Sequence, residues 1–280
     1  MKRGLVIGLL ALAALIYPHA ADAIDVQLFD VTGGGSVFLG DFGVAGQHSV
    51  NIAPGTYGNF RIGLCPGCTG SPNAFLDTSN PSVAKLFYTN NSTTYLGTGT
   101  GILQINVTDS LNPLPTTGSY SAADAMSGLY GRVPSPAGDN ITLTGLFSPP
   151  CSGEGCSFVT PANLATLSFT ASTLVTSFAS PSPTTPGLVS IIFNAGDTPT
   201  IFTQTTLTFL HTNDVINLPR SVGGFFSTVS GDVGAEAVRQ AVLDEINTPL
   251  DVPGPATALL LGSAMVLWSA VRRKRSARGA

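Results

Sequence analysis

Four cysteines are the residues of this chain whose type and spacing most directly suggest chemistry. They form two close pairs, Cys65/Cys68 in CPGC and Cys151/Cys156 in CSGEGC. A redox-active CxxC pair lies at the start of a helix, which stabilises the thiolate. Turn-forming residues follow CPGC, which argues against a redox site. Haem attachment requires a histidine directly after the second cysteine, and Thr69 stands there instead. A four-cysteine zinc site would favour a second CxxC. The spacing therefore favours disulfides. It leaves all three pairings open, with a slight preference for pairing within each motif.

The two histidines after residue 23 do not form a metal-ligand motif. His48 and His211 are far apart, and neither has a second histidine four residues away. His211 lies near Asn213 and Asp214 at the end of a predicted strand. A calcium or zinc site is an alternative there, but a strand-end histidine beside turn residues is the simpler interpretation. We therefore expect no metal and no cofactor.

Other catalytic motifs are also missing from the sequence. No G-x-S-x-G nucleophile motif occurs. The glycine-rich GTGTG at 97–101 precedes a strand, whereas glycines that bind phosphate open a helix, so this segment is expected to be a hairpin turn. The sequence predicts that the protein is not an enzyme. A secreted hydrolase with a pair of carboxylates across a cleft remains an alternative.

The charge distribution argues against nucleic-acid binding. Residues 24–253 contain five basic side chains and fifteen carboxylates. Such a surface repels a phosphate backbone. Seven of the twelve basic residues lie instead near the two ends of the chain.

The elements that would position any site are short strands. Runs rich in β-branched and aromatic residues recur between clusters of Gly, Pro, Asn and Ser, as in HSVNI, VAKLFYT, GILQINVT and IFTQTTLTFL. Several alternate apolar and polar residues, which is typical of antiparallel strands with one buried face. The pattern predicts an all-β protein, an antiparallel β-sandwich of jelly-roll type over 24–230. One short helix is predicted at 232–247 from Val238, Val242 and Ile246, within a helix-and-linker segment 231–250.

The first 23 residues have the layout of a secretory signal peptide. Lys2 and Arg3 precede an apolar run, and Ala21 and Ala23 provide the A-x-A spacing before a cleavage site at Ile24. Signal peptidase would then be a processing partner. An uncleaved anchor is the alternative.

The last thirty residues, 251–280, combine a proline motif, an apolar run and a basic end. The apolar run 257–271 is about 22 Å long as a helix, against a hydrocarbon core of about 30 Å, and the basic cluster after it would stay cytoplasmic. A short transmembrane helix is predicted, with a plain single-pass anchor as the alternative. The residues that carry the pattern are Val252, Pro253, Gly254, Pro255, Ala256, Thr257, Arg272, Arg273, Lys274 and Arg275.

This order of parts resembles the PEP-CTERM sorting signal of Gram-negative bacteria. The resemblance covers only the tail and the accompanying signal peptide, and Gly254 stands where the family motif has Glu. It implies export, recognition by an exosortase at the inner membrane, removal of the tail, and delivery to the cell surface or an extracellular matrix.

The function expected for the body is that of a non-catalytic surface or matrix protein. The alternative is a carbohydrate-binding module that holds exopolysaccharide through exposed aromatic side chains. The candidates for those side chains are Tyr57, Phe60, Tyr120 and Tyr130.

Overall fold

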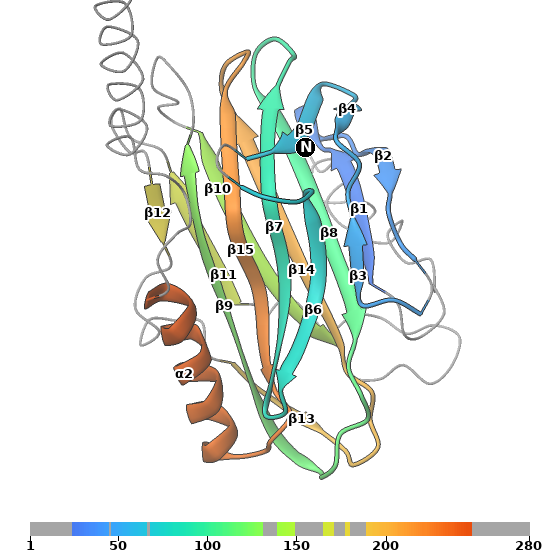
Figure 1. Cartoon of the computed structure of the whole chain (residues 1–280), viewed down its shortest axis with the longest axis vertical. Coiled ribbons are helices and arrows are strands. Elements are labelled where there is room, and N and C mark those ends of the chain that lie inside the picture. Colours follow the sequence, from blue (N-terminus) through green and yellow to red (C-terminus); the bar gives the residue numbers. More distant parts are fainter. Residues whose placement is uncertain are drawn as a thin grey trace, which may run out of the picture.

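Alternating apolar and polar residues produce strands with one buried face. In β14 (Thr200–Phe209) every second side chain is buried, and β8 (Gly101–Ser110) shows nearly the same alternation. The computed structural model describes residues 24–44, 46–65, 68–130, 139–148, 165–170, 177–179 and 189–247. Within these ranges the chain forms two antiparallel sheets that pack face to face, with one helix (Figure 1).

The first sheet has six strands in the order β11-β10-β14-β8-β1-β2. Besides β8 and β14, its strands are β1 (Asp25–Asp30), β2 (Val37–Asp41), β10 (Asn140–Ser148) and β11 (Ala165–Thr170). A 3₁₀ turn, η1 (Thr32–Gly34), connects β1 to β2.

The second sheet has nine strands, with the main order β12-β9-β15-β7-β5-β4. Strand β13 pairs with β9, and β6 pairs with both β7 and β3. The strands are β3 (Ser49–Asn51), β4 (Gly55–Tyr57), β5 (Phe60–Leu64), β6 (Asn73–Asn80), β7 (Val83–Tyr95), β9 (Gly118–Tyr130), β12 (Ser177–Ala179), β13 (Val189–Phe193) and β15 (Val215–Ser227).

The last two strands occupy central positions, one in each sheet. Strand β14 lies between β10 and β8 in the first sheet, and β15 lies between β9 and β7 in the second. The short segment 210–214 therefore carries the chain from the middle of one sheet to the middle of the other.

The main core fills the space between the sheets. Aromatic rings from both sheets meet there: Phe60 and Tyr95 lie with centroids 5.4 Å apart, and Phe209 lies 5.9 Å from each. Tyr120, Phe193 and Phe226 form a second aromatic group in the same core. Apolar residues from both sheets share this single cluster, so the predicted β-sandwich is confirmed at the level of two packed antiparallel sheets.

The helix α2 (Asp232–Asn247) covers part of the outer face of the second sheet (Figure 1). Val238 and Val242 are buried against Phe87 of β7 and Phe225 of β15. An ion pair between Lys85 Nζ and Glu245 Oε1, 3.0 Å apart, joins the same two layers. The predicted helix is confirmed, and it gives the strands beneath it a second buried face.

The prediction of a hairpin turn at 97–101 is wrong. Strands β7 and β8 lie in different sheets, so this segment crosses from one sheet to the other. The Tyr95 ring packs against it, and a Cβ at Gly101 would come within 2.2 Å of Tyr95 Cε2. Glycine is therefore required at Gly101 to let the ring approach the backbone.

No helix among the described residues is long and apolar enough to cross a membrane. The apolar run 257–271, which carries the predicted transmembrane helix, lies outside these residues.

Candidate functional site

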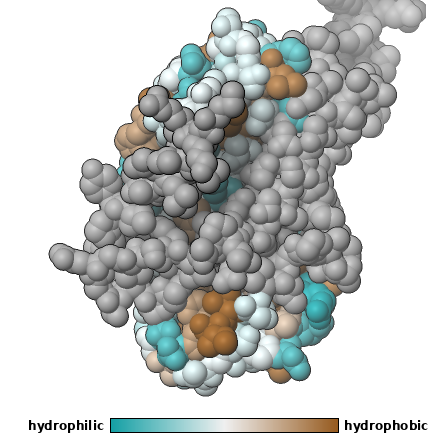
Figure 2. Space-filling view, turned by 180° about the vertical axis from the view of Figure 1, so that it is seen from behind, coloured by the Kyte–Doolittle hydropathy of each residue, from teal (hydrophilic) through white to brown (hydrophobic). Residues whose placement is uncertain are grey.

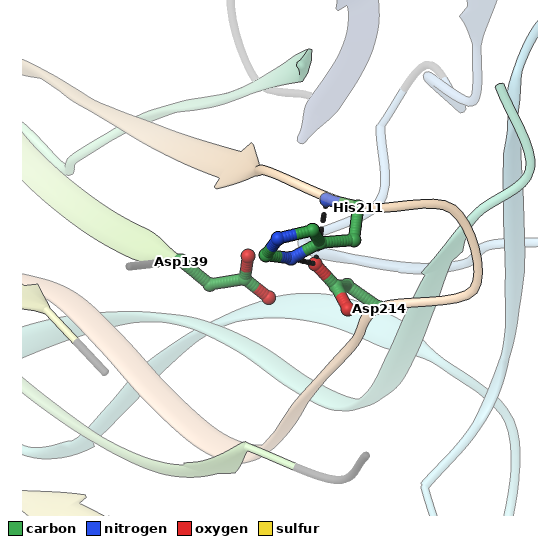
Figure 3. Close-up of side chains that lie close together, drawn as sticks. All are labelled: Asp139, His211 and Asp214. Atoms are coloured by element: carbon green, nitrogen blue, oxygen red, sulfur yellow. Dashed lines mark hydrogen bonds and ion pairs between the residues drawn. The ribbon is translucent and has the colours of Figure 1, made fainter. Parts of the chain in front are cut away.

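Three side chains that can each donate a metal ligand converge where the two sheets are connected. Ligand atoms of Asp139, His211 and Asp214 all lie within 4.8 Å of one another. Figure 3 shows the Asp139 carboxylate facing the His211 ring and the Asp214 carboxylate. This is the only group of three such side chains found among the described residues.

Strand pairing brings Asp139 to this place. In the register of β10 with β14, Asn140 lies opposite Thr208. Asp139 immediately precedes β10 and therefore lies beside the end of β14. The backbone N–H of Leu210 donates to Asp139 Oδ1 over 3.0 Å, which fixes the orientation of the carboxylate.

His211 and Asp214 are held together within the connection between β14 and β15. The backbone N–H of His211 donates to Asp214 Oδ2 over 2.8 Å, and His211 Nδ1 lies 3.1 Å from the same oxygen. Asn213 has a φ of 68°, a left-handed conformation that asparagine tolerates in turns. The turn geometry thus places the imidazole ring over its own carboxylate partner.

The same connection is fixed to the end of β7. The N–H of Asn213 donates to the Tyr95 carbonyl over 2.7 Å, and the N–H of Tyr95 donates to the Asp214 carbonyl over 3.0 Å. The Thr212 hydroxyl donates to the Gly97 carbonyl over 2.6 Å. These bonds tie the segment to the end of β7 and to the connection that follows it.

The three groups differ sharply in burial. Asp139 and Asp214 are fully buried, whereas the His211 side chain is 53% exposed. Two acidic ligands thus lie beneath the surface, and the imidazole lies between them and solvent. Such an arrangement can bind a cation that enters from the histidine side.

A second histidine–aspartate pair has almost the same geometry. His48 Nδ1 lies 3.0 Å from both oxygens of Asp109, whose side chain is fully buried while His48 is 50% exposed. Among the described residues this pair does not belong to a three-ligand group. Both histidines after residue 23 therefore pair with a buried aspartate, and only His211 also has Asp139 nearby.

The first cysteine pair forms the disulfide Cys65–Cys68, with Cα atoms 5.3 Å apart. Cys65 follows directly after β5, and the next element is the strand β6, so the pair does not open a helix. Local pairing is confirmed for CPGC. Cys151 and Cys156 lie outside the described residues.

The residues of both targeting signals also lie outside the described part of the chain, with one exception. Ile24, the expected first residue after cleavage, is fully buried, and its N–H donates to the Gln47 carbonyl over 2.8 Å. Ala21, Ala23 and all residues of the tail motif from Val252 to Arg275 lie beyond the described ranges.

Two of the aromatic residues expected to bind sugars are in fact core residues. Phe60 and Tyr120 are fully buried, so their prediction as exposed contacts is wrong. Tyr57 is half-buried, packs edge-on against Phe42 and donates its hydroxyl to the Ala53 carbonyl. The side chain of Tyr130 lies outside what the structure describes. The alternating strand pattern could have identified Phe60, because its neighbour Arg61 occupies the exposed face.

The described surface carries only scattered apolar side chains. Figure 2 shows them in separate patches toward the two ends of the molecule. The most exposed are Ile192, Val233, Val37 and Phe38.

Comparison with known proteins gives no family assignment. No family model matches the chain, and no curated protein matches it. Among solved structures, the carbohydrate-binding module TmCBM61 in complex with β-1,4-galactotriose aligns at 10% identity and a TM-score of 0.26, covering 60% of this chain and 90% of that module.

Two further solved structures align over comparable lengths of this chain. A carbohydrate-binding module of the β-sandwich superfamily aligns at 10% identity and a TM-score of 0.19, covering 73% of this chain and 83% of the module. The enzymatically active domain of tailspike protein 4 of bacteriophage CBA120 aligns at 6% identity and a TM-score of 0.23, covering 62% of this chain and 21% of that one. All three TM-scores are below 0.5, so these alignments do not establish a shared fold.

Proposed function

We propose that the protein is an exported, non-catalytic protein of the cell surface or extracellular matrix, sorted through an exosortase-type C-terminal signal. The observation that carries the proposal is the Cys65–Cys68 disulfide at a strand end. Structural disulfides persist in oxidising compartments outside the cytoplasm. This location agrees with the signal peptide and the tail predicted from the sequence.

In this proposal signal peptidase cleaves before Ile24, the tail enters the inner membrane, and an exosortase removes it. The buried position of Ile24 supports a folded body that begins directly after the signal peptide. The jelly-roll type of strand connection is likewise part of the proposal.

The test is the intact mass of the protein recovered outside the cell from a strain that has an exosortase. We expect a chain that begins at Ile24 and ends near Pro253, with a mass that includes the Cys65–Cys68 disulfide. A Gly254→Glu variant, which restores the carboxylate of the family motif, should be processed at least as completely. Recovery of only a full-length, membrane-bound form in both variants would refute sorting and favour a permanent anchor.

A second function, binding of exopolysaccharide, is favoured by an uncharged polar row on the outer face of the six-stranded sheet. Gln104 lies opposite Thr206, and Gln204 lies opposite Asn106, on the central strands β8 and β14. The Gln104 and Gln204 amides both donate to Asn106 Oδ1, over 3.1 and 3.3 Å. Asn106 is itself buried, and the half-buried Gln104, Gln204 and Thr206 around it can hydrogen-bond sugar hydroxyls without a charged partner.

The binding test uses immobilised exopolysaccharide from the producing strain. We expect the protein to be retained, and retention to fall when Thr206 and Gln204 are replaced by alanine. Gln240→Ala on α2 is the matched control and should leave retention unchanged. No retention of the unaltered protein would exclude this second function without affecting the sorting proposal.

A further inference from the structure

We propose that Asp139, His211 and Asp214 bind a divalent transition-metal ion, for which Zn²⁺ is the best match, and that this ion fastens the β14–β15 connection to the start of β10. The proposal concerns the folded body alone and does not depend on the sorting signal or on sugar binding.

The distances suit a single small ion. His211 Nδ1 and Asp214 Oδ2 lie 3.1 Å apart. Two ligands of a tetrahedral ion, each bonded at about 2.1 Å, are about 3.4 Å apart. Ligand atoms of all three side chains lie within 4.8 Å of one another, close enough to surround one ion.

The mixed nitrogen and oxygen ligand set indicates the class of metal. Ca²⁺ takes six to eight oxygen ligands, and Mg²⁺ also prefers oxygen. An imidazole together with carboxylates suits Zn²⁺ and related transition metals, which accept three protein ligands plus water. The exposed side of His211 faces the solvent from which that water would come.

Hydrogen bonds from the backbone orient both acidic ligands. The N–H of Leu210 holds one oxygen of Asp139, and the N–H of His211 holds one oxygen of Asp214. Outer contacts of this kind fix the direction of metal ligands in known sites. The two carboxylates therefore reach the site in set positions, from segments more than seventy residues apart in sequence.

The position of the site gives the ion a structural consequence. His211 and Asp214 belong to the segment that joins the centres of the two sheets, and Asp139 introduces β10, the neighbour of β14. An ion bound to all three side chains adds a link between two segments that strand pairing and the bond from Leu210 to Asp139 already connect. We expect metal binding to raise the melting temperature.

The second histidine pair provides an internal control. His48 with Asp109 reproduces the distance and burial of His211 with Asp214, but without a third ligand in the described structure. Replacing either histidine by alanine removes a half-exposed ring that pairs with a buried carboxylate. Only His211→Ala should remove a metal ligand.

The experiment uses the full chain without a histidine tag, stripped of metal with a chelator and held in detergent. Zn²⁺ binding is measured by calorimetry and by metal analysis after equilibrium dialysis, with Ca²⁺ and Mg²⁺ in parallel. We expect about one tightly bound zinc per chain, as three protein ligands allow. His211→Ala should weaken binding by about tenfold or more, whereas His48→Ala should not change it. Zinc should also raise the melting temperature of the unaltered protein and of His48→Ala only.

Three results would overturn the proposal. One is the absence of stoichiometric zinc binding to the unaltered protein. Another is an equal loss of affinity in His48→Ala and His211→Ala, which would show that zinc binds nonspecifically to histidine. The third is tighter binding of Ca²⁺ than of Zn²⁺, which would contradict the ligand-set argument.

Discussion

Replacing Tyr88 by phenylalanine should stabilise the protein, because the Tyr88 hydroxyl is buried without a hydrogen-bond partner among the described residues. Tyr88 lies in β7, is 2% exposed, and belongs to the core between the sheets. A buried polar group that loses water and gains no partner costs about 1–3 kcal/mol. Removing only the oxygen keeps the ring and its packing. We expect Tyr88→Phe to raise the free energy of unfolding by about 1 kcal/mol or more at neutral pH.

The same substitution should change the response to alkali. Burial raises the pKa of Tyr88 above its ordinary value near 10. Below pH 10 both the folded and unfolded states keep the proton, so stability does not depend on this group. Above pH 10 the unfolded chain loses the proton first, and the free energy of unfolding falls by about 1.4 kcal/mol per pH unit. Tyr88→Phe should remove this part of the alkaline loss of stability.

The assay is urea unfolding of the full chain, followed by far-UV circular dichroism at pH 7 and at pH 11. Tryptophan fluorescence does not suit this assay, since the single tryptophan, Trp268, lies in the tail and not in the body. Tyr95→Phe is the matched control, because the Tyr95 hydroxyl donates to the Thr98 carbonyl over 3.1 Å. The control should lose about 1 kcal/mol at pH 7. A Tyr88→Phe variant that is destabilised as much as the control would refute the reasoning.

Three further substitutions test other contacts. Gly101→Ala should destabilise the protein by about 1–3 kcal/mol, because the new methyl group would overlap the buried Tyr95 ring; the midpoint of thermal unfolding measures the effect. Glu245→Gln should leave Lys85 without its charged partner; the two side chains are only 17% and 14% exposed. The free energy of unfolding in urea should fall by about 1–2 kcal/mol, more than for the same change in a fully exposed pair. Replacing Cys68 by serine opens a very short ring and should cost about 2 kcal/mol in urea unfolding relative to the oxidised unaltered protein. Reduction of the unaltered protein should cause the same loss.

Local patterns were sufficient to predict most of the architecture. Alternating residues in the segment of β8 predicted a half-buried strand, and valines four residues apart predicted α2 with the bounds that the structure shows. The pattern did not show that β7 is covered on both faces. Phe87 faces the helix, while Leu86 and Tyr88 face the other sheet. Lys85, two residues before Phe87, made the helix-facing side resemble a solvated face, although it pairs with Glu245 of α2.

The candidate metal site was only half visible in the sequence. His211 and Asp214 are three residues apart, and the sequence offered a metal site there only as the alternative to a strand-end histidine beside turn residues. Asp139 gave no local signal, because it lies in a Gly- and Pro-rich segment that would favour a turn in any protein. Its approach depends on the pairing of β10 with β14, and long-range register cannot be read from one strand alone.

The central placement of β14 and β15 has a consequence for the order in which the molecule can fold. Each sheet is split into two halves until its last strand arrives, since β14 joins β10 to β8 and β15 joins β9 to β7. In a chain that emerges N-terminus first, neither sheet can therefore form completely until residues 200–227 have emerged. During that interval open strand edges and apolar faces are exposed to neighbouring chains. A chain cut before residue 200 would therefore contain most of the described strands but no complete sheet.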